Sequence, residues 1–398
     1  MEPLDPTSHT ILQSQLQSIK HTLKIKKNSY YSLIKIIPKK FLLFQFQHIK
    51  SKKLFNEILT IKRKFYPTTR ILKLTGHSDT IISVCFSPCN RFFASGSIDG
   101  TARIYGIDPF NPYFNGNLYY VFNLRYSVSS VCFSKARYYF AVSCLHSNLV
   151  QIFYFNYLDK KNIGKKLLEI NNDGNKTFSV QFSSDANFLI LGNDIGLLSV
   201  YGTDPDNITT YGKLVSKKSS HKNAVVSVSF SNSISNLRYI ATGGQDEIAN
   251  LIKFNTTNNS LEILFKFEEQ NGGPVWSVSF SPNDEFIATG SYDNTVCIYG
   301  VNESDSENFG KLITRLGGHT WSVTSVCFSP NGKYLASGSE DVSINLHKIN
   351  LNSKTPFKSK KHMSKLTRSH NKVITSIAFS TNGYLGSGSK DYTSVIYY

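Results

Sequence analysis

The sequence predicts an all-β fold in which seven similar units, each with four short strands, close into one array. The main observation is a five-residue motif, Ser-Val-x-Phe-Ser or a close variant, that occurs seven times. Its phenylalanine stands at positions 86, 133, 182, 230, 280, 328 and 379, so that successive copies are 47 to 51 residues apart. A period near fifty residues indicates repeated supersecondary units. Turn-forming residues between the copies leave room for four short strands in each repeat.

The motif itself is predicted to be a strand. Its Val and Phe lie two residues apart and share one face of an extended chain, whereas the small serines take the other face. Both faces are therefore apolar or small. This is typical of a strand that packs on two sides inside stacked sheets.

The first repeat shows the other strands in order. A short apolar segment at 71–74 precedes the motif, a turn with Pro88 and Asn90 follows it, and residues 92–97 are the next strand. The dipeptide Asp99-Gly100 indicates a tight hairpin, and residues 101–105 are the following strand.

These repeats resemble the WD-repeat family of β-propellers. The matching features are the Gly-His pairs at 76–77 and 318–319, the Phe-Ser-Pro turns at 86–88, 280–282 and 328–330, the small-residue strands at 94–97, 288–291 and 336–339, and the turn aspartates Asp99, Asp246, Asp293, Asp341 and Asp391. The resemblance implies a seven-bladed β-propeller of four-stranded antiparallel blades over residues 71–398. Blades 2 and 3 match least well.

Two structural expectations follow from this resemblance. In the family, the outer strand of the last blade comes from the N-terminal side, so residues 71–74 should pair with 393–398. A histidine before each innermost strand also bonds to the turn aspartate of its blade. We therefore expect structural His–Asp pairs, and the residues are His77, Asp99, His319, Asp341, His370 and Asp391.

The family's tryptophan inside each blade is replaced in this chain. Its position holds Tyr105, Phe153, Tyr201, Ile252, Tyr299, His347 and Tyr397 in blades 1 to 7. A phenol or a phenyl ring cannot reproduce the indole N–H. We therefore expect the family's His–Ser–Asp–Trp hydrogen-bond relay to be incomplete.

Residues 1–70 are predicted to be a basic N-terminal extension, partly disordered and partly helical. They hold 14 of the 44 Lys and Arg residues but 3 of the 27 Asp and Glu residues. Within them, 41–66 has an apolar stripe at helical spacing, flanked by lysines. Such a helix could dock on a partner, on the propeller or on a lipid surface, or it could pack on the body with solvated lysines.

The remaining composition narrows the class of protein. The sequence contains no run of eighteen apolar residues, so we expect no membrane span, and no secretory signal is visible. Three of the six cysteines share one position of the motif in different repeats, so we expect buried thiols, no metal site and a reducing compartment, the cytoplasm or nucleus. No nucleophile motif, phosphate loop or metal-ligand spacing occurs, so we expect no catalytic residue, no cofactor and no enzyme activity.

Two functions remain. The first is a protein-interaction scaffold, a monomeric ring within a larger complex, that binds proteins or peptides. By the resemblance, its partner-binding face would include Trp276, Tyr292 and Trp321, although Trp276 could equally cap the blade core. The alternative is an RNA- or ribonucleoprotein-associated assembly factor that uses the basic arm and the basic loop 350–365.

Overall fold

The computed structural model describes residues 71–398 except 109–110, 112, 269–271, 350–363 and 368. Every regular element in this part of the chain is a β-strand. The predicted N-terminal extension, its helix near 41–66 and most of the basic loop 350–365 lie outside the described residues.

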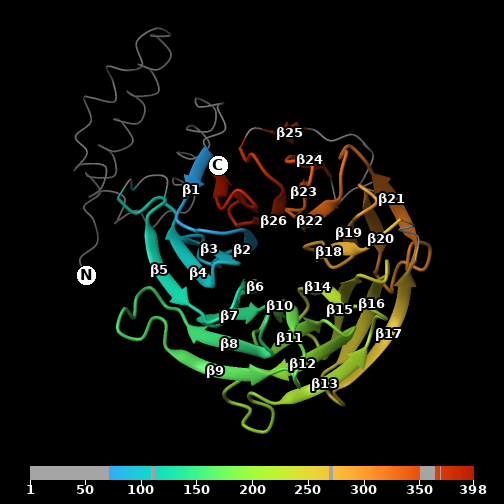
Figure 1. The fold of residues 1–398 in the computed structure, drawn as a ribbon. Helices are drawn as coiled ribbons and strands as arrows, with labels where there is room; N and C mark the ends of the chain where they lie inside the picture. Colours follow the sequence, from blue (N-terminus) through green and yellow to red (C-terminus); the bar gives the residue numbers. More distant parts are fainter. Residues whose placement is uncertain (1–70, 109–110, 112, 269–271, 350–363, 368) are drawn as a thin grey trace, which may run out of the picture. The chain divides into compact units, whose positions relative to one another are not determined.

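The strands form seven four-stranded antiparallel sheets, which stand as blades around a ring (Figure 1). From the innermost strand outward, blades 1 to 3 contain β2 (Ile81–Phe86), β3 (Phe92–Ser97), β4 (Thr101–Gly106) and β5 (Leu118–Asn123); β6 (Val128–Phe133), β7 (Tyr139–Cys144), β8 (Leu149–Tyr154) and β9 (Lys166–Asn171); and β10 (Thr177–Phe182), β11 (Phe188–Asn193), β12 (Leu197–Gly202) and β13 (Leu214–Ser219). The predicted fold class is confirmed.

The remaining blades follow the same order. Blades 4 to 6 contain β14 (Val225–Phe230), β15 (Leu237–Gly244), β16 (Ala249–Asn255) and β17 (Ser260–Phe267); β18 (Val275–Phe280), β19 (Phe286–Ser291), β20 (Val296–Gly300) and β21 (Leu312–Leu316); and β22 (Val323–Phe328), β23 (Tyr334–Ser339), β24 (Ile344–Lys348) and β25 (Ser364–Leu366). Blade 7 contains β26 (Ile374–Phe379), β27 (Leu385–Ser389), β28 (Ser394–Tyr397) and β1 (Ile71–Leu74).

The two ends of the propeller sequence close the ring, as predicted. Strand β1 pairs antiparallel with β28, from Ile71 opposite Tyr397 to Leu74 opposite Ser394. The side chain of Asn90 also bonds to both the backbone N–H and the hydroxyl of Thr381 across the same seam. Blade 7 therefore has its fourth strand, and no edge of its third strand is left open.

The first serine of the motif bonds each blade to the next. Its Oγ accepts a hydrogen bond of 3.0–3.3 Å from the backbone N–H of the motif's aliphatic residue in the following blade. The seven bonds join Ser83 to Val131, Ser130 to Val180, Ser179 to Val228, Ser227 to Val278, Ser277 to Val326, Ser325 to Ile377 and Ser376 to Val84. The serine thus satisfies a backbone donor on the neighbouring innermost strand. We call these bonds the serine latches.

The second serine of the motif holds the turn after the innermost strand. Its Oγ accepts a bond of 2.8–3.1 Å from a backbone N–H at or next to the start of the following strand, or from the third N–H of that strand in blade 4. The pairs are Ser87 with Phe92, Ser134 with Tyr139, Ser183 with Phe188, Ser231 with Tyr239, Ser281 with Phe286, Ser329 with Tyr334 and Ser380 with Tyr384. Both serines of the motif therefore have a bonding role in all seven blades.

A glycine in the second strand lets the next blade approach. A Cβ atom built there would lie 2.4–2.8 Å from the first residue of the next innermost strand, which is too close for any side chain. The glycines are Gly96, Gly192, Gly243, Gly290, Gly338 and Gly388. Blade 2 has Ser143 instead, and the residue it faces in blade 3 is the polar Thr177. Ser129 bonds to both, through the hydroxyl of Ser143 and the carbonyl of Thr177.

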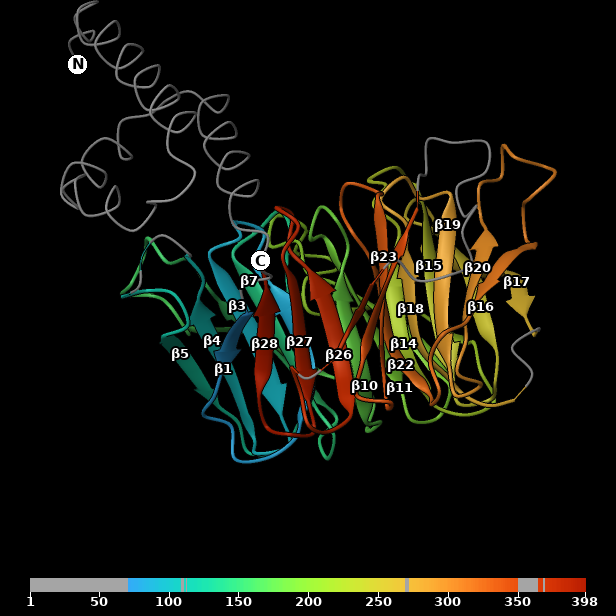
Figure 2. The ribbon, with the colours of Figure 1, turned by 90° about the horizontal axis from the view of Figure 1, so that it is seen from above.

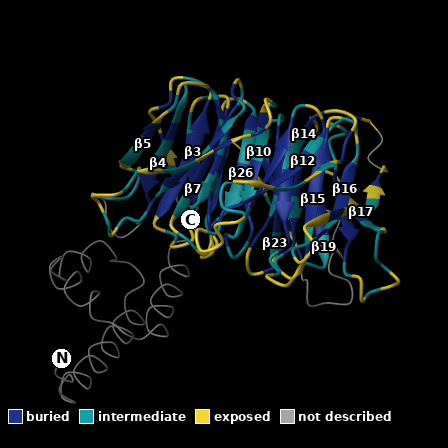
Figure 3. Ribbon diagram, turned by 90° about the horizontal axis from the view of Figure 1, so that it is seen from below, coloured by how far each residue is buried: buried dark blue, intermediate teal, exposed yellow. Residues whose placement is uncertain are grey.

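The hydrophobic cores lie between adjacent blades. The seam between blades 1 and 2 is rich in phenylalanine, with Phe122 and Phe133 packed on Phe140 at ring distances of 5.2 and 4.7 Å. The seam between blades 6 and 7 is mostly aliphatic and includes Ile344 and Ile374. The strands run between the two faces of the ring, and exposed residues gather in the turns and loops at these faces (Figures 2 and 3).

Four connections between third and fourth strands close with the same hydrogen bond. They span 106–116, 154–164, 202–212 and 300–310, and each closes with a bond of 2.8–2.9 Å from the N–H of its last residue, a glycine, to the carbonyl of its first. The closing glycines have φ between 71° and 82° and lie against the outer strand of the preceding blade. We call these segments the lapping loops. They fasten four seams at the rim.

Candidate interaction face

One face of the ring carries the loops before the innermost strands and the turns with the aspartates. We call it the His–Asp face. In blades 1, 6 and 7, histidine Nδ1 lies 2.7–3.0 Å from a carboxylate oxygen of the turn aspartate, and Nε2 lies 2.8 Å from the hydroxyl of a serine in the second strand. The sets are His77, Asp99 and Ser95; His319, Asp341 and Ser337; and His370, Asp391 and Ser387.

Blade 4 contains a fourth set, which His221 forms with the turn aspartate Asp246. His221 Nδ1 lies 2.8 Å from Asp246, and Nε2 lies 2.8 Å from the hydroxyl of Thr242. Ser220 replaces the glycine before this histidine, and 25 residues separate His221 from Asp246, compared with 21 or 22 in the other sets.

A neutral imidazole with its proton on Nδ1 fits these partners. A carboxylate can only accept, so Nδ1 donates to it, and the serine hydroxyl then donates to Nε2. Burial lowers the pKa of His77, His221 and His370, although the neighbouring carboxylate of each opposes this shift. Burial also opposes ionisation of Asp99, but hydrogen bonds from Thr101 and His77 hold the pKa of this carboxyl below its usual value.

These sets are enclosed rather than open to a substrate. The side chains of His77 and Asp99 are 1% and 5% exposed, and those of His370 and Asp391 are 0% and 4% exposed. The aspartate also accepts from the backbone N–H that follows the histidine, at 3.1 Å in both blades. These hydrogen bonds connect the loop before the innermost strand to the turn of the same blade, which is a structural role.

The tyrosines in the family's tryptophan position bond elsewhere. Tyr105 donates its hydroxyl proton to the carbonyl of Thr75, and Tyr201 donates to the carbonyl of Asn171, each at 3.1 Å. Both rings are buried. The phenol thus bonds to the backbone just before the loop, so the side chain still links the third strand to that loop.

Blades 2 and 3 hold their turns by other groups. Ser147 of blade 2 accepts from the N–H of Leu149, and Asn193 of blade 3 accepts from the N–H of Leu197. Blade 5 keeps the aspartate, and Asp293 accepts from the N–H and the hydroxyl of Thr295. These turns therefore stand without a histidine among the described residues.

The three expected partner-binding residues lie at one seam of the His–Asp face. Tyr292 and Trp321 are 55% and 64% exposed, and Trp276 is half-buried. Gly290 of β19 packs on Val323 of β22 across the seam between blades 5 and 6. Tyr292 stands two residues beyond Gly290 and Trp321 two residues before Val323, both toward the His–Asp face. The two aromatic residues therefore flank the same seam.

Trp276 occupies a bulged position at the start of β18. A register shift occurs between Val275 and Ser277, and each of the other six innermost strands has one at the same place. In three blades this position holds a Ser or Thr that bonds to a carbonyl of the next blade, from Ser129 to Thr177, Thr324 to Ile374 and Thr375 to Ile81. By this equivalence the Trp276 position also faces the seam between blades 5 and 6.

The basic segments that would contact RNA in the alternative function lie mostly outside the described residues. Lys365, at the end of the basic loop, is described, and its ammonium group lies 3.2 Å from Asp341. The arm 1–70 and the rest of loop 350–365 stay predictions as contact sites for RNA.

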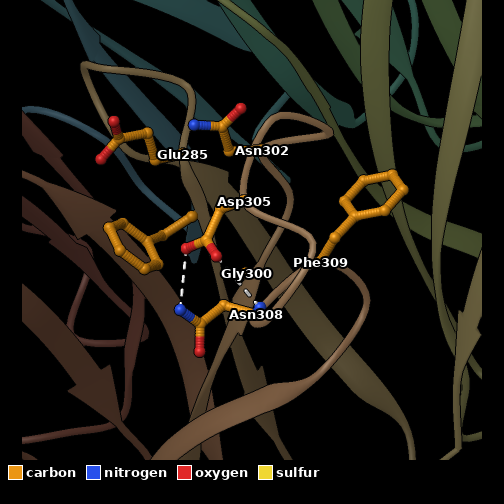
Figure 4. Close-up of a pocket in the computed structure, with 7 residues that line it drawn as sticks. Glu285, Gly300, Asn302, Asp305, Asn308 and Phe309 are labelled. Carbon is orange, nitrogen blue, oxygen red and sulfur yellow. Dashed lines mark hydrogen bonds between the residues drawn. The ribbon is translucent and has the colours of Figure 1, made fainter.

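A small pocket lies beside the lapping loop of blade 5 (Figure 4). It is lined by Glu285, Phe286, Asn302 and the lapping loop of blade 5. Asp305 accepts a bond of 2.7 Å from the amide of Asn308 within that loop. The polar groups of this pocket therefore stabilise the loop itself.

Neither metal nor membrane chemistry marks the described residues. Among them, no three His, Cys, Asp or Glu side chains gather as metal ligands would. No helix in the same residues has the length and apolar character needed to cross a membrane.

Comparison with known proteins agrees with this architecture. The family model for the WD domain, G-beta repeat (WD40), matches residues 68–106, 261–300 and 310–345. A search of curated proteins found no match. The matched segments fall in blades 7 to 1, 4 to 5 and 5 to 6, and the other blades share their serine latches and strand order. The chain therefore contains three WD40 repeats within a seven-bladed β-propeller.

Proposed function

We propose that this chain is a non-catalytic interaction scaffold, a monomeric ring that docks a partner protein or peptide within a larger complex. The partner lies on the His–Asp face, across the seam between blades 5 and 6. The observation that carries the proposal is the exposed pair Tyr292 and Trp321 on that seam. Trp and Tyr are enriched among the few residues that dominate binding energy.

The other seams offer no such pair. The residue pairs at the positions equivalent to Tyr292 and Trp321 differ at every other seam. They are Ile98 and Tyr126 at seam 1–2, Leu145 and Asn175 at seam 2–3, Asp194 and Asn223 at seam 3–4, Gln245 and Gly273 at seam 4–5, Glu340 and Lys372 at seam 6–7, and Lys390 and Asp79 at seam 7–1. Two of these pairs are opposite charges, and the others contain at most one aromatic ring. Exposed aromatic area is thus concentrated at one of seven otherwise similar places, which favours a specific contact over chance exposure.

A reducing compartment, the cytoplasm or nucleus, suits this scaffold. All six cysteines are unpaired. Burial raises the pKa of Cys132 and Cys144 to about 11, so both thiols stay protonated and poorly reactive at neutral pH. Unpaired buried thiols are usual in reducing compartments.

The experiment is a comparison of partner recovery by the full chain and its variants. Trp276→Ala and Trp321→Ala should each lose a set of co-purified proteins, and purified members of that set should rebind the parent chain. Ile195→Ala is the matched control, because Ile195 is 56% exposed on the same face of blade 3. Circular dichroism and melting establish that every variant is folded.

The outcome also separates the two functions. Unchanged recovery by both folded tryptophan variants would contradict the proposed contact. Recovery of RNA-containing complexes that falls steeply between low and physiological salt would favour the ribonucleoprotein alternative, because phosphate contacts release counterions.

A further inference from the structure

The most exposed large apolar side chains of the described residues are not on the His–Asp face. Tyr113, Ile208 and Leu158 are 90%, 80% and 74% exposed, whereas the highest value on the His–Asp face is 64%. Each of the three lies in a different lapping loop, in the consecutive blades 1, 2 and 3. In Figure 1 the connections between β8 and β9 and between β12 and β13 lie at the outer rim of the ring.

The lapping loops present these side chains on a rigid support. Each loop is closed by its glycine bond, for example from Gly212 N–H to Gly202 O at 2.8 Å. In the loops of blades 2 and 3, an Asx turn also fixes the first bend, since Asn156 accepts from the N–H of Leu158 and Asp204 from that of Asp206. The apolar tips are therefore held out in water, where exposure has no benefit for folding.

Basic groups stand beside each tip, although the same loops also contain acidic residues, among them Asp159 and the exposed Asp206. Lys160 and Lys161 are exposed beside Leu158. Asp204, in the loop of Ile208, is paired with Arg137 at 2.6 Å. The exposed Arg91 lies with its guanidinium over the ring of Phe114, in the loop that carries Tyr113.

Blade 5 provides an internal contrast. Its lapping loop has the same closing bond, from Gly310 to Gly300, but its exposed residues include Glu303 and Glu307 and no large apolar side chain. The loop conformation alone therefore does not require an apolar tip, and the apolar and the acidic loops occupy different sectors of one face.

We propose that the face opposite the His–Asp face docks on an anionic lipid surface by inserting Tyr113, Leu158 and Ile208. Separate apolar tips suit a bilayer, because each tip can enter the interface independently while basic groups such as Lys160 and Lys161 beside Leu158 meet lipid phosphates. A protein partner would instead favour one contiguous packed centre. The acidic loop of blade 5 would be repelled, so the ring should tilt with blades 1 to 3 toward the membrane.

The first test places an environment-sensitive fluorophore on single cysteines in the full chain. Leu158→Cys and Ile208→Cys are labelled in a Cys89→Ser background, because Cys89 is the exposed native thiol. With phosphatidylserine-containing vesicles, both labels should shift to the blue and brighten. Ile195→Cys, on the opposite face, is the control and should not change.

This design distinguishes insertion of the tips from attraction of the basic extension to the vesicles. The extension can hold the chain near the vesicles, but this alone does not move the labels out of water. Sedimentation with vesicles but no spectral change at 158 and 208 would overturn the proposal and leave the tips to a protein partner. An equal change at 195 would overturn it as well.

The second test removes the apolar tips together. The chain with Tyr113→Ser, Leu158→Ser and Ile208→Ser should bind the same vesicles at least about tenfold more weakly, because the apolar insertion is lost. A matched variant with Ile98→Ser, Ile195→Ser and Tyr392→Ser should bind as the parent does. Equal binding by the first variant and the parent would contradict the proposal.

Discussion

Blades 1, 4, 6 and 7 contain the His–Asp sets, whereas blades 2, 3 and 5 show none among the described residues, yet all seven are complete four-stranded sheets. What both groups share is the serine latch, the turn serine and the position of the innermost strand. The comparison teaches that the ring depends on bonds and packing between blades, while the His–Asp sets are a local addition within single blades.

The seam between blades 2 and 3 shows how far the packing between adjacent blades can vary. Ser143 stands where six blades have glycine, and Thr177 stands where the facing residue is Val or Ile. The two changes accompany each other, since the smaller, polar Thr177 faces the larger Ser143. Close packing therefore limits the combined volume of the two residues that face each other across the seam, and it does not require glycine itself.

The largest effect should come from overfilling a seam. Gly338→Val in blade 6 places a Cβ atom 2.8 Å from Ile374 and adds two methyl groups beyond it. We expect the free energy of unfolding to fall by about 3 kcal/mol or more, because a packed interior cannot absorb the volume. Chemical denaturation of the full chain measures this loss.

A double-mutant cycle sharpens the same comparison. Gly338→Ser should destabilise the chain by about 1–3 kcal/mol, and adding Ile374→Thr, which copies the seam between blades 2 and 3, should recover part of that loss. Strictly additive losses would show that Ser143 and Thr177 are not a compensating pair.

A serine latch should matter equally in both groups of blades. Ser325→Ala leaves the buried N–H of Ile377 without its acceptor, and Ser130→Ala does the same to Val180. Each should lower the free energy of unfolding by about 1–3 kcal/mol, the cost of an unsatisfied buried donor. Ser130 lies in a blade without a His–Asp set and Ser325 in a blade with one. A clear difference between the two losses would contradict the view that the ring depends on the latches.

Much of the fold could be predicted because its signals are local and repeated. The period of the motif predicted the number of blades, and the resemblance to the propeller family predicted the closing pair of 71–74 with 393–398. The latch role of the first serine could not be predicted, because it depends on where a neighbouring blade places its N–H. The sequence shows such serines as small residues and nothing more.

The lapping loops were missed for a different reason. Their residues differ between blades, and what recurs is an Asp or Asn at the third and sixth positions and a glycine at the last. Asp108 and Asn111 in blade 1 correspond to Asn302 and Asp305 in blade 5. Asp and Asn exchange freely there because either side chain can accept the bond of a turn, so the repeat has no constant letter.

The candidate site was predictable in part. Trp276, Tyr292 and Trp321 could be placed toward one face from their distance to the motif and the turn aspartate. The exposed tips of the lapping loops could not be found, because a lone Tyr, Leu or Ile in a polar loop has the same sequence pattern whether it folds inward or stands in water.

The smallest effect should come from a His–Asp set, and it should depend on pH. His370→Ala removes the bonds to Asp391 and Ser387 within one blade, so we expect a loss of about 1 kcal/mol at pH 7.5. Burial holds the pKa of His370 below its ordinary value, with a further contribution from Lys73. In the unfolded chain a histidine titrates near pH 6.5, so below about this pH the unfolded chain binds a proton that the folded chain does not.

The stability due to His370 is thus fully present above about pH 7 and is lost as the pH falls toward the folded-state pKa. The difference in unfolding free energy between the parent chain and His370→Ala should therefore shrink from pH 7.5 to pH 5.5, as measured by denaturation at each pH. Asp391 does not enter this window, because its pKa lies below its usual acidic value. His146→Ala is the control for replacing a histidine, since His146 is exposed on the same face. A difference for His370→Ala that grows on acidification would mean that the folded chain carries a charged imidazolium paired with Asp391, and the set would then be an ion pair rather than a neutral hydrogen-bonded relay.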